Sequence, residues 1–256
     1  TRYTQPCMVA FAAGITAVLR EEGIVPSLAA GLSLGEYSAL HAAGVWDAAQ
    51  AVSLASFRGR AMEEAVRDRS CGMVAVLGLS RAALADICRR ASSLGVAEIA
   101  NYNCPGQLVI GGDAAAVEEA SRLAREAGAR RTVPLKVSGP FHTSLMAPAG
   151  EALRERFREV HFNAPAFPVV HNATARPAQQ GEEIDQLLIR QVQSPVYFED
   201  SLRYLEDQGV DTAVEIGPGR ALSAFVKKTA PGIRVWAVED VPSLTAAVAA
   251  LKGEAS

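Results

Sequence analysis

The chain has little net charge, few cysteines and no long apolar run, and each of these absences excludes a class of protein. Its 256 residues carry a formal net charge of −3, which disfavours general nucleic-acid binding. The apolar stretches are short or interrupted by charge, and no basic segment precedes a signal-like stretch, so neither a membrane span nor a secretion signal is expected. The cysteines are far apart and include no C-x-x-C pair, which predicts reduced thiols in a cytoplasmic protein without a metal site: Cys7, Cys71, Cys88 and Cys104.

The sequence instead alternates apolar, strand-like segments with amphipathic helical ones. Hydrophobic residues make up 49% of the chain, enough for one large domain or a large and a small one. The alternation over residues 1–70 and 138–256 predicts a mostly parallel sheet with helices on both faces, an α/β core. Residues 71–137 follow the order strand–helix–strand–strand–helix–strand, which is the ferredoxin-like pattern, with Ser80 and Asp113 expected as helix caps.

The segment GLSLGEYSAL (residues 31–40) places a serine between two glycines at G-x-S-x-G spacing. The apolar run from Val25 to Ala30 predicts a strand before it, and helical spacing follows, which is the setting of a nucleophile elbow at Ser33. Gly31 and Gly35 are expected to leave room for the strained turn, and the N-terminus of the helix would favour a developing oxyanion. The alternative is a small residue in an ordinary turn.

A serine nucleophile needs a general base, and the chain offers four histidines. His41 lies too far along the helix after Ser33 to turn back, and His161 is expected at a solvated helix end. His171 ends a predicted strand, at the edge where parallel sheets carry active sites, and stays a second candidate. His142 follows a strand and a glycine–proline turn, from where it can reach the elbow, and is the favoured base.

Arg58 lies in the otherwise apolar stretch LASFRGRAM (residues 54–62), beside Gly59, which leaves room for close approach. A surface position is the alternative, as for most arginines. A guanidinium in apolar surroundings suits a bidentate grip on a carboxylate. A serine hydrolase does not need that grip, whereas transfer of an acyl group with a free terminal carboxylate does.

Seven motifs, in order along nearly the whole chain, resemble the malonyl-CoA:acyl-carrier-protein transacylases, the acyltransferases of fatty acid and polyketide synthesis. They are TQP (4–6), GLSLGEYSAL (31–40), FRGRAMEEA (57–65), NYNCPGQLVIGG (101–112), VSGPFHTSLM (137–146), RQVQSPVYF (190–198) and VEIGPGRALS (214–223). The resemblance implies an α/β-hydrolase-like core, residues 1–70 and 138–256, carrying a ferredoxin-like subdomain, residues 71–137. It also implies a monomeric enzyme without cofactor that moves malonyl from malonyl-CoA to acyl carrier protein through a serine ester.

The same resemblance assigns roles to individual residues. Ser33 is the nucleophile, His142 the base, Arg58 the holder of the malonyl carboxylate, and the backbone N–H of Leu34 one oxyanion donor. The backbone carbonyl of Gln191 orients His142 in place of an aspartate, so Gln191→Ala is expected to be mild. The remaining positions are expected around the substrate pocket, with the bulky Phe141 selecting malonyl over methylmalonyl: Met62, Asn103, Leu135, Val137 and Phe141.

Two features depart from the family pattern. Leu32 stands where the family usually has histidine, which is expected to change the polarity of the pocket and not to abolish activity. The family also begins with a strand and a GQGSQ-type loop that supplies the second oxyanion donor, and we expect such a segment before Thr1 in the natural protein. Two other functions stay open: a serine esterase or thioesterase, and a catalytically weak domain that docks carrier protein.

Overall fold

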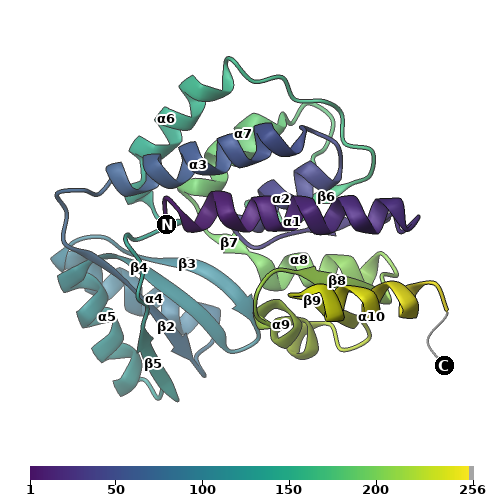
Figure 1. Ribbon diagram of the computed structural model, residues 1–256. Helices are drawn as coiled ribbons and strands as arrows, with labels where there is room; N and C mark the ends of the chain where they lie inside the picture. The colour runs from purple at the N-terminus through teal and green to yellow at the C-terminus, as the bar shows by residue number, and fades with distance from the viewer. Residues whose placement is uncertain (254–256) are drawn as a thin grey trace.

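The computed structural model describes residues 1–253, which form an α/β fold of ten α-helices and nine strands in three sheets (Figure 1). The helices are α1 (Thr4–Glu21), α2 (Gly35–Ala42), α3 (Ala48–Glu64), α4 (Arg81–Ala91), α5 (Ala114–Glu126), α6 (Ala147–Phe157), α7 (Ile184–Val192), α8 (Phe198–Asp207), α9 (Ala221–Thr229) and α10 (Val241–Leu251). The strands are β1 (Ala29–Ala30), β2 (Cys71–Leu77), β3 (Ala97–Cys104), β4 (Gln107–Asp113), β5 (Arg131–Pro134), β6 (Val169–Val170), β7 (Val196–Tyr197), β8 (Thr212–Ile216) and β9 (Arg234–Val238).

The largest sheet has five strands in the order β5-β2-β4-β3-β7. Each neighbouring pair among its first four strands is antiparallel, and these strands come from residues 71–137, in the predicted order of strands and helices. The helices α4 and α5 pack on this sheet through a buried cluster that includes Val76, Leu84, Ile110 and Leu123 (Figure 1). The fifth strand, β7, pairs with β3 in parallel, so the sheet extends beyond the predicted subdomain.

The expected mostly parallel sheet is wrong for the described residues. Besides β7 on β3, the parallel strands there form only two separate pairs, β1 with β6 and β8 with β9. The predicted strand over residues 25–30 is shortened to two residues, Ala29 and Ala30, which pair with the equally short β6; Pro26 has no N–H to donate to a ladder. A cavity of about 610 Å³, lined by residues of both β1 and β8, lies between the pairs.

The main hydrophobic core lies among α2, α3, α6 and α7, where Tyr37, Leu54, Met146 and Leu188 are fully buried. Ser80 caps α4 as predicted, since its hydroxyl accepts from the Ala83 N–H. Asp113 occupies the N-cap position of α5 as predicted, but its side chain makes no capping bond. None of the helices within residues 1–253 has the length and apolar character that a membrane span requires.

Candidate active site

Ser33 lies in the sharp turn between β1 and α2, and its φ of +56° is unusual for a residue with a side chain. A Cβ added to Gly31 would lie 2.0 Å from the backbone carbon of Gly35, so the close packing of helix on strand requires glycine there. At Gly35 an added Cβ would meet nothing within 4 Å, so the expected steric need for this second glycine is wrong. The strained turn places Ser33, which is half-buried, at the start of α2.

His142 is the histidine that meets this serine. Its Nε2 lies 2.7 Å from Ser33 Oγ, and its Nδ1 lies 2.8 Å from the backbone oxygen of Gln191. Because a carbonyl oxygen only accepts, Nδ1 carries the proton and Nε2 is left to accept from the serine hydroxyl. Burial, and then the positive charge of Arg58, lower the pKa of His142 from 6.5 to about 3, against the opposing bond to Gln191. The imidazole is therefore neutral at pH 7, as a general base must be.

Arg58 is buried, with 1% of its surface exposed, so the surface alternative is excluded. Its Nη1 donates to Gln5 Oε1 (2.7 Å), and its Nη2 lies 3.0 Å from Ser33 Oγ and 3.1 Å from Gln191 Oε1. Its Nε–H has no acceptor, and no carboxylate within residues 1–253 forms an ion pair with the guanidinium. Burial lowers the pKa of Arg58, although the nearby Tyr37 and Glu36 oppose the shift. The site thus holds a cation whose charge no neighbouring carboxylate neutralises.

The other residues expected near the reacting atoms occupy the same region of the core. Leu34 is the N-cap of α2, and its N–H donates to no acceptor in the described part of the chain, which leaves it free for an oxyanion. Met62 is buried, and its sulfur accepts from Gln5 Nε2 at 3.6 Å. Phe141 packs against two buried clusters, one around Tyr37 and one around Met73.

Three expected pocket residues make no hydrogen bond to Ser33, His142 or Arg58 in the described structure. Asn103 lies buried in β3, and its Oδ1 has no partner within residues 1–253. Leu135 packs on the Met73 cluster, and Val137 is 44% exposed. Their expected places at the substrate pocket remain predictions.

The structure also shows the surroundings of Leu32 and of the three histidines other than His142. Leu32 packs against the apolar cluster around Val170 and Phe198. His41 Nδ1 bonds to a backbone carbonyl at 3.1 Å, and His161 is exposed. His171, the second candidate base, bonds through Nδ1 to Glu36 Oε1 at 2.7 Å and so does not serve Ser33.

The structure adds three residues that the motifs did not single out: Gln5, Glu36 and Asn172. Gln5 holds Arg58, Glu36 accepts from Gln191 Nε2 at 2.9 Å, and Asn172 Oδ1 accepts from the Ser33 N–H at 2.6 Å. A signal existed for Glu36, because an acidic residue three positions after the serine lies on the face of α2 that carries the site. Nothing in the local sequence marks Asn172.

Residues 1–251 match the acyl transferase domain family. The chain belongs to this family. It is 42% identical over 255 residues to the malonyl CoA-acyl carrier protein transacylase of Bacillus subtilis, covering 99% of this chain and 80% of that relative. The crystal structure of the MCAT of Streptococcus pneumoniae superimposes with a TM-score of 0.92 at 48% identity, over 97% of this chain and 81% of that one. A malonyl-transacylase in complex with a holo type II polyketide synthase acyl-carrier protein matches with a TM-score of 0.93 at 39% identity, over 97% and 81% of the two chains.

Proposed function

We propose that this acyl transferase moves a malonyl group from malonyl-CoA to the phosphopantetheine thiol of an acyl carrier protein through an ester on Ser33. One observation carries the proposal. Ser33 Oγ lies 2.7 Å from His142 Nε2 and 3.0 Å from Arg58 Nη2, and this buried guanidinium has no carboxylate partner in residues 1–253. The relatives named as malonyl CoA-acyl carrier protein transacylases support the same substrate pair.

In the first half-reaction, Ser33 Oγ attacks the thioester carbonyl while His142 Nε2 takes the hydroxyl proton. The carbonyl oxygen becomes an oxyanion, which the Leu34 N–H at the start of α2 is placed to stabilise. When the intermediate collapses, the carbon–sulfur bond breaks and the imidazolium returns its proton to the thiolate of CoA. The products are the malonyl ester of Ser33 and free CoA.

Arg58 selects the acyl group in this mechanism. The carboxylate carbon of a malonyl group is two bonds from the reacting carbonyl carbon, so a carboxylate holder must lie close to the nucleophile. The 3.0 Å between Arg58 Nη2 and Ser33 Oγ meets that requirement, and the Nε–H without an acceptor offers a further donor. An acetyl group would leave the guanidinium buried and unpaired, which is costly.

In the second half-reaction, the thiol of the carrier protein replaces CoA and the same steps run in reverse. His142 takes the thiol proton, sulfur attacks the malonyl ester, and the proton returns to Ser33 Oγ. A thiolate needs little help from an acid, so a histidine oriented by the neutral carbonyl of Gln191, without an aspartate, suits the reaction. No cofactor takes part in these steps.

The proposal extends to the architecture. The parallel pairs and their helices support an α/β-hydrolase-like core in residues 1–70 and 138–256, and the strand order β5-β2-β4-β3 supports a ferredoxin-like subdomain in residues 71–137. We take the enzyme to be a cytoplasmic monomer, a location that its four free thiols suit.

Phe141 is the residue proposed to discriminate against a branched acyl group. It directly precedes His142 and is held between two buried clusters, so it has little room to move away from an α-methyl group. Rejection of one methyl group is worth only about 1–3 kcal/mol. We therefore expect the preference for malonyl over methylmalonyl to be weaker than the preference for malonyl over acetyl, with Met62, Asn103, Leu135 and Val137 completing the pocket.

Mass spectrometry after brief exposure to malonyl-CoA tests the proposal. A stable malonyl ester on the peptide that contains Ser33, discharged by the thiol of a carrier protein, is the expected result. Rapid release of free malonate would instead support an esterase or thioesterase. No adduct, together with binding of carrier protein, would leave only the docking domain.

A further inference from the structure

The mechanism above leaves unused a buried carboxylate, that of Glu36, which lies three residues beyond the nucleophile in the first turn of α2. The side chain is fully buried. Its Oε1 accepts from His171 Nδ1 at 2.7 Å, and its Oε2 accepts from the Asn172 backbone N–H at 3.0 Å and from Gln191 Nε2 at 2.9 Å. A carboxylate without water needs such donors, and it fixes their orientation in return.

The first connection from Glu36 leads to the backbone of the nucleophile. The Asn172 side chain accepts from the Ser33 N–H through Oδ1 and donates to the Gly31 carbonyl through Nδ2, both at 2.6 Å. One amide therefore bonds to the two backbone groups that flank Leu32, immediately before the strained Ser33. A positive φ at a residue with a side chain is strained and persists only where the surroundings enforce it.

The second connection leads to the substrate-selecting arginine. Gln191 Nε2 donates to Glu36 and to the Ser33 carbonyl (2.8 Å), while its Oε1 accepts from Arg58 Nη2. With the amide reversed, its NH₂ group would face the guanidinium, donor against donor. The Glu36 carboxylate thus sets the amide so that its oxygen faces Arg58. The amide also keeps the two charges from pairing directly, which would occupy the cation that the substrate needs.

We propose that Glu36 is a positioning residue for acyl transfer: through Asn172 and Gln191, its carboxylate holds Ser33 in attacking geometry and Arg58 in carboxylate-binding geometry. The part that concerns Arg58 rests on the proposed function. The part that concerns Ser33 holds for any reaction of this serine.

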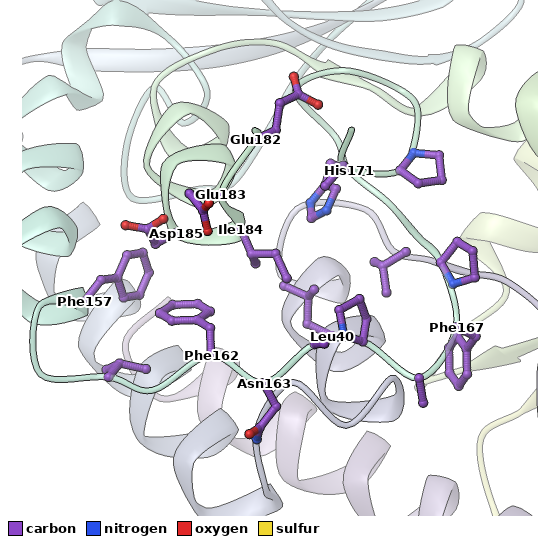
Figure 2. Close-up of a pocket in the computed structure, with 18 residues that line it drawn as sticks. Leu40, Phe157, Phe162, Asn163, Phe167, His171, Glu182, Glu183, Ile184 and Asp185 are labelled. Carbon is purple, nitrogen blue, oxygen red and sulfur yellow. The ribbon is translucent and has the colours of Figure 1, made fainter. Parts of the chain in front are cut away.

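His171 is the remaining donor to Glu36, and it borders a cavity that a small molecule can enter. The residue is 2% exposed, and its imidazole forms part of the wall of a cavity of about 870 Å³ whose other walls include Leu40, Phe162 and Phe167 (Figure 2). Ser33 is not among the residues that line this cavity. A small molecule can therefore reach the His171 position without occupying the place of the substrate.

The first test compares Glu36→Gln with Glu183→Gln, the same change at an exposed carboxylate that lines the same cavity. One readout is the rate of labelling by a neutral fluorophosphonate, in which Ser33 Oγ bonds to phosphorus and fluoride leaves. The other is the ratio of malonyl to acetyl ester formed on Ser33. We expect Glu36→Gln to lower both by about tenfold, since a small misplacement of reacting groups has effects of this size or larger, and Glu183→Gln to change neither.

Labelling of Ser33 at an unchanged rate in Glu36→Gln would overturn the proposal, even if the melting temperature fell, because the residue would then be structural only. If the unsubstituted protein forms no malonyl ester, the proposed function fails. The labelling comparison still decides the role of Glu36 toward Ser33 in that case.

A second variant covers the event that Glu36→Gln does not fold. His171→Ala removes one donor to Glu36 and joins its space to the cavity, so we expect slower labelling that added imidazole restores. The matched control is 1-methylimidazole, used at a pH where both compounds are neutral, because it has the same ring but no N–H to donate to Glu36. Equal labelling of His171→Ala and the unsubstituted protein, or equal rescue by the two compounds, contradicts the proposal.

Discussion

Two arginines of this chain, Arg81 and Arg58, differ in how the protein balances their charge. Arg81, the first residue of α4, donates to Asp200 at 2.8 Å and forms an ion pair with Glu199 at 3.0 Å, with its guanidinium 4.7 Å from the centroid of the Tyr102 ring. Its side chain is 39% exposed, so water also solvates it. Arg58 is almost fully buried, and its acceptors within residues 1–253 are all neutral. The charge of Arg81 is thus committed to joining α4 to α8, whereas that of Arg58 stays available to a ligand.

The pKa shifts of the two arginines express the same difference. Burial acts to lower the pKa of Arg81, but its hydrogen bonds to Asp200 and Glu199 outweigh that effect and the pKa is raised. Burial also lowers the pKa of Arg58, and there the opposing influences of Tyr37 and Glu36 are too small to reverse the shift. A buried cation without a counter-ion is unfavourable in the free protein, and a bound carboxylate removes that cost.

The largest expected effect is the loss of the general base, His142, which lies at the site of Arg58 and not in the region of Arg81. His142→Ala should slow formation of the malonyl ester on Ser33 by about 10²–10⁴-fold, because His142 is the one proton acceptor that contacts Ser33 Oγ in the described part of the chain. Arg81→Ala, in the other region, should leave that rate close to the unsubstituted value. Intact-protein mass spectrometry of single-turnover samples measures both, and a similar rate in the two variants would mean that His142 is not the base.

The next effect concerns the two arginines themselves. Arg58→Ala should slow malonyl transfer about a hundredfold, the consequence of losing charge-assisted hydrogen bonds worth about 3 kcal/mol, while acetyl transfer is spared or raised. Arg81→Ala should lower the melting temperature and leave the malonyl-to-acetyl ratio unchanged. The ratio comes from parallel assays with the two CoA thioesters, and an equal loss for both in Arg58→Ala would make Arg58 structural.

A smaller effect is expected at Gln191. The motifs alone predict a mild Gln191→Ala, because the backbone oxygen that orients His142 survives. The contacts of the side chain with Ser33, Glu36 and Arg58 lead us to expect a larger effect. We expect a loss of about tenfold in the acylation rate, the equivalent of one or two net hydrogen bonds. Gln193→Ala, two residues along the chain, is the control, and equal rates in the two variants would restore the milder expectation.

The smallest effect is a shift in pH dependence. With the pKa of His142 lowered to about 3, labelling of Ser33 by a neutral fluorophosphonate should stay constant from about pH 7 to about pH 5 and fall only at lower pH. Arg58→Ala removes a positive charge that disfavours the imidazolium, so the acid limb should move to higher pH. A limb near 6.5 in the unsubstituted protein would show that the imidazole is solvated as in a free histidine.

Some features were predictable because they are encoded locally. The elbow is specified by residues within one turn of Ser33, and the requirement for glycine at Gly31 follows from the steep turn into α2. The strands β8 and β9 are also locally encoded, since each is a short, largely apolar segment between turn residues. The pairing of the strands was not predictable in the same way, and the expected mostly parallel sheet was wrong, because pairing depends on partners far along the chain. The two-residue β1 pairs with β6, about 140 residues later.

The sequence by itself determined the α/β class, the elbow serine, the favoured histidine and the family, since each depends on spacing within a short segment or on the order of motifs. Only the tertiary structure decided that Glu36, Asn172 and Gln191 form one hydrogen-bonded unit under the nucleophile. The bonds that join them to each other or to Ser33 span 136 to 158 residues. Hydrogen bonds of 2.6–3.0 Å over such separations exist only after the helices have packed, because their geometry depends on the whole core and not on any local pattern.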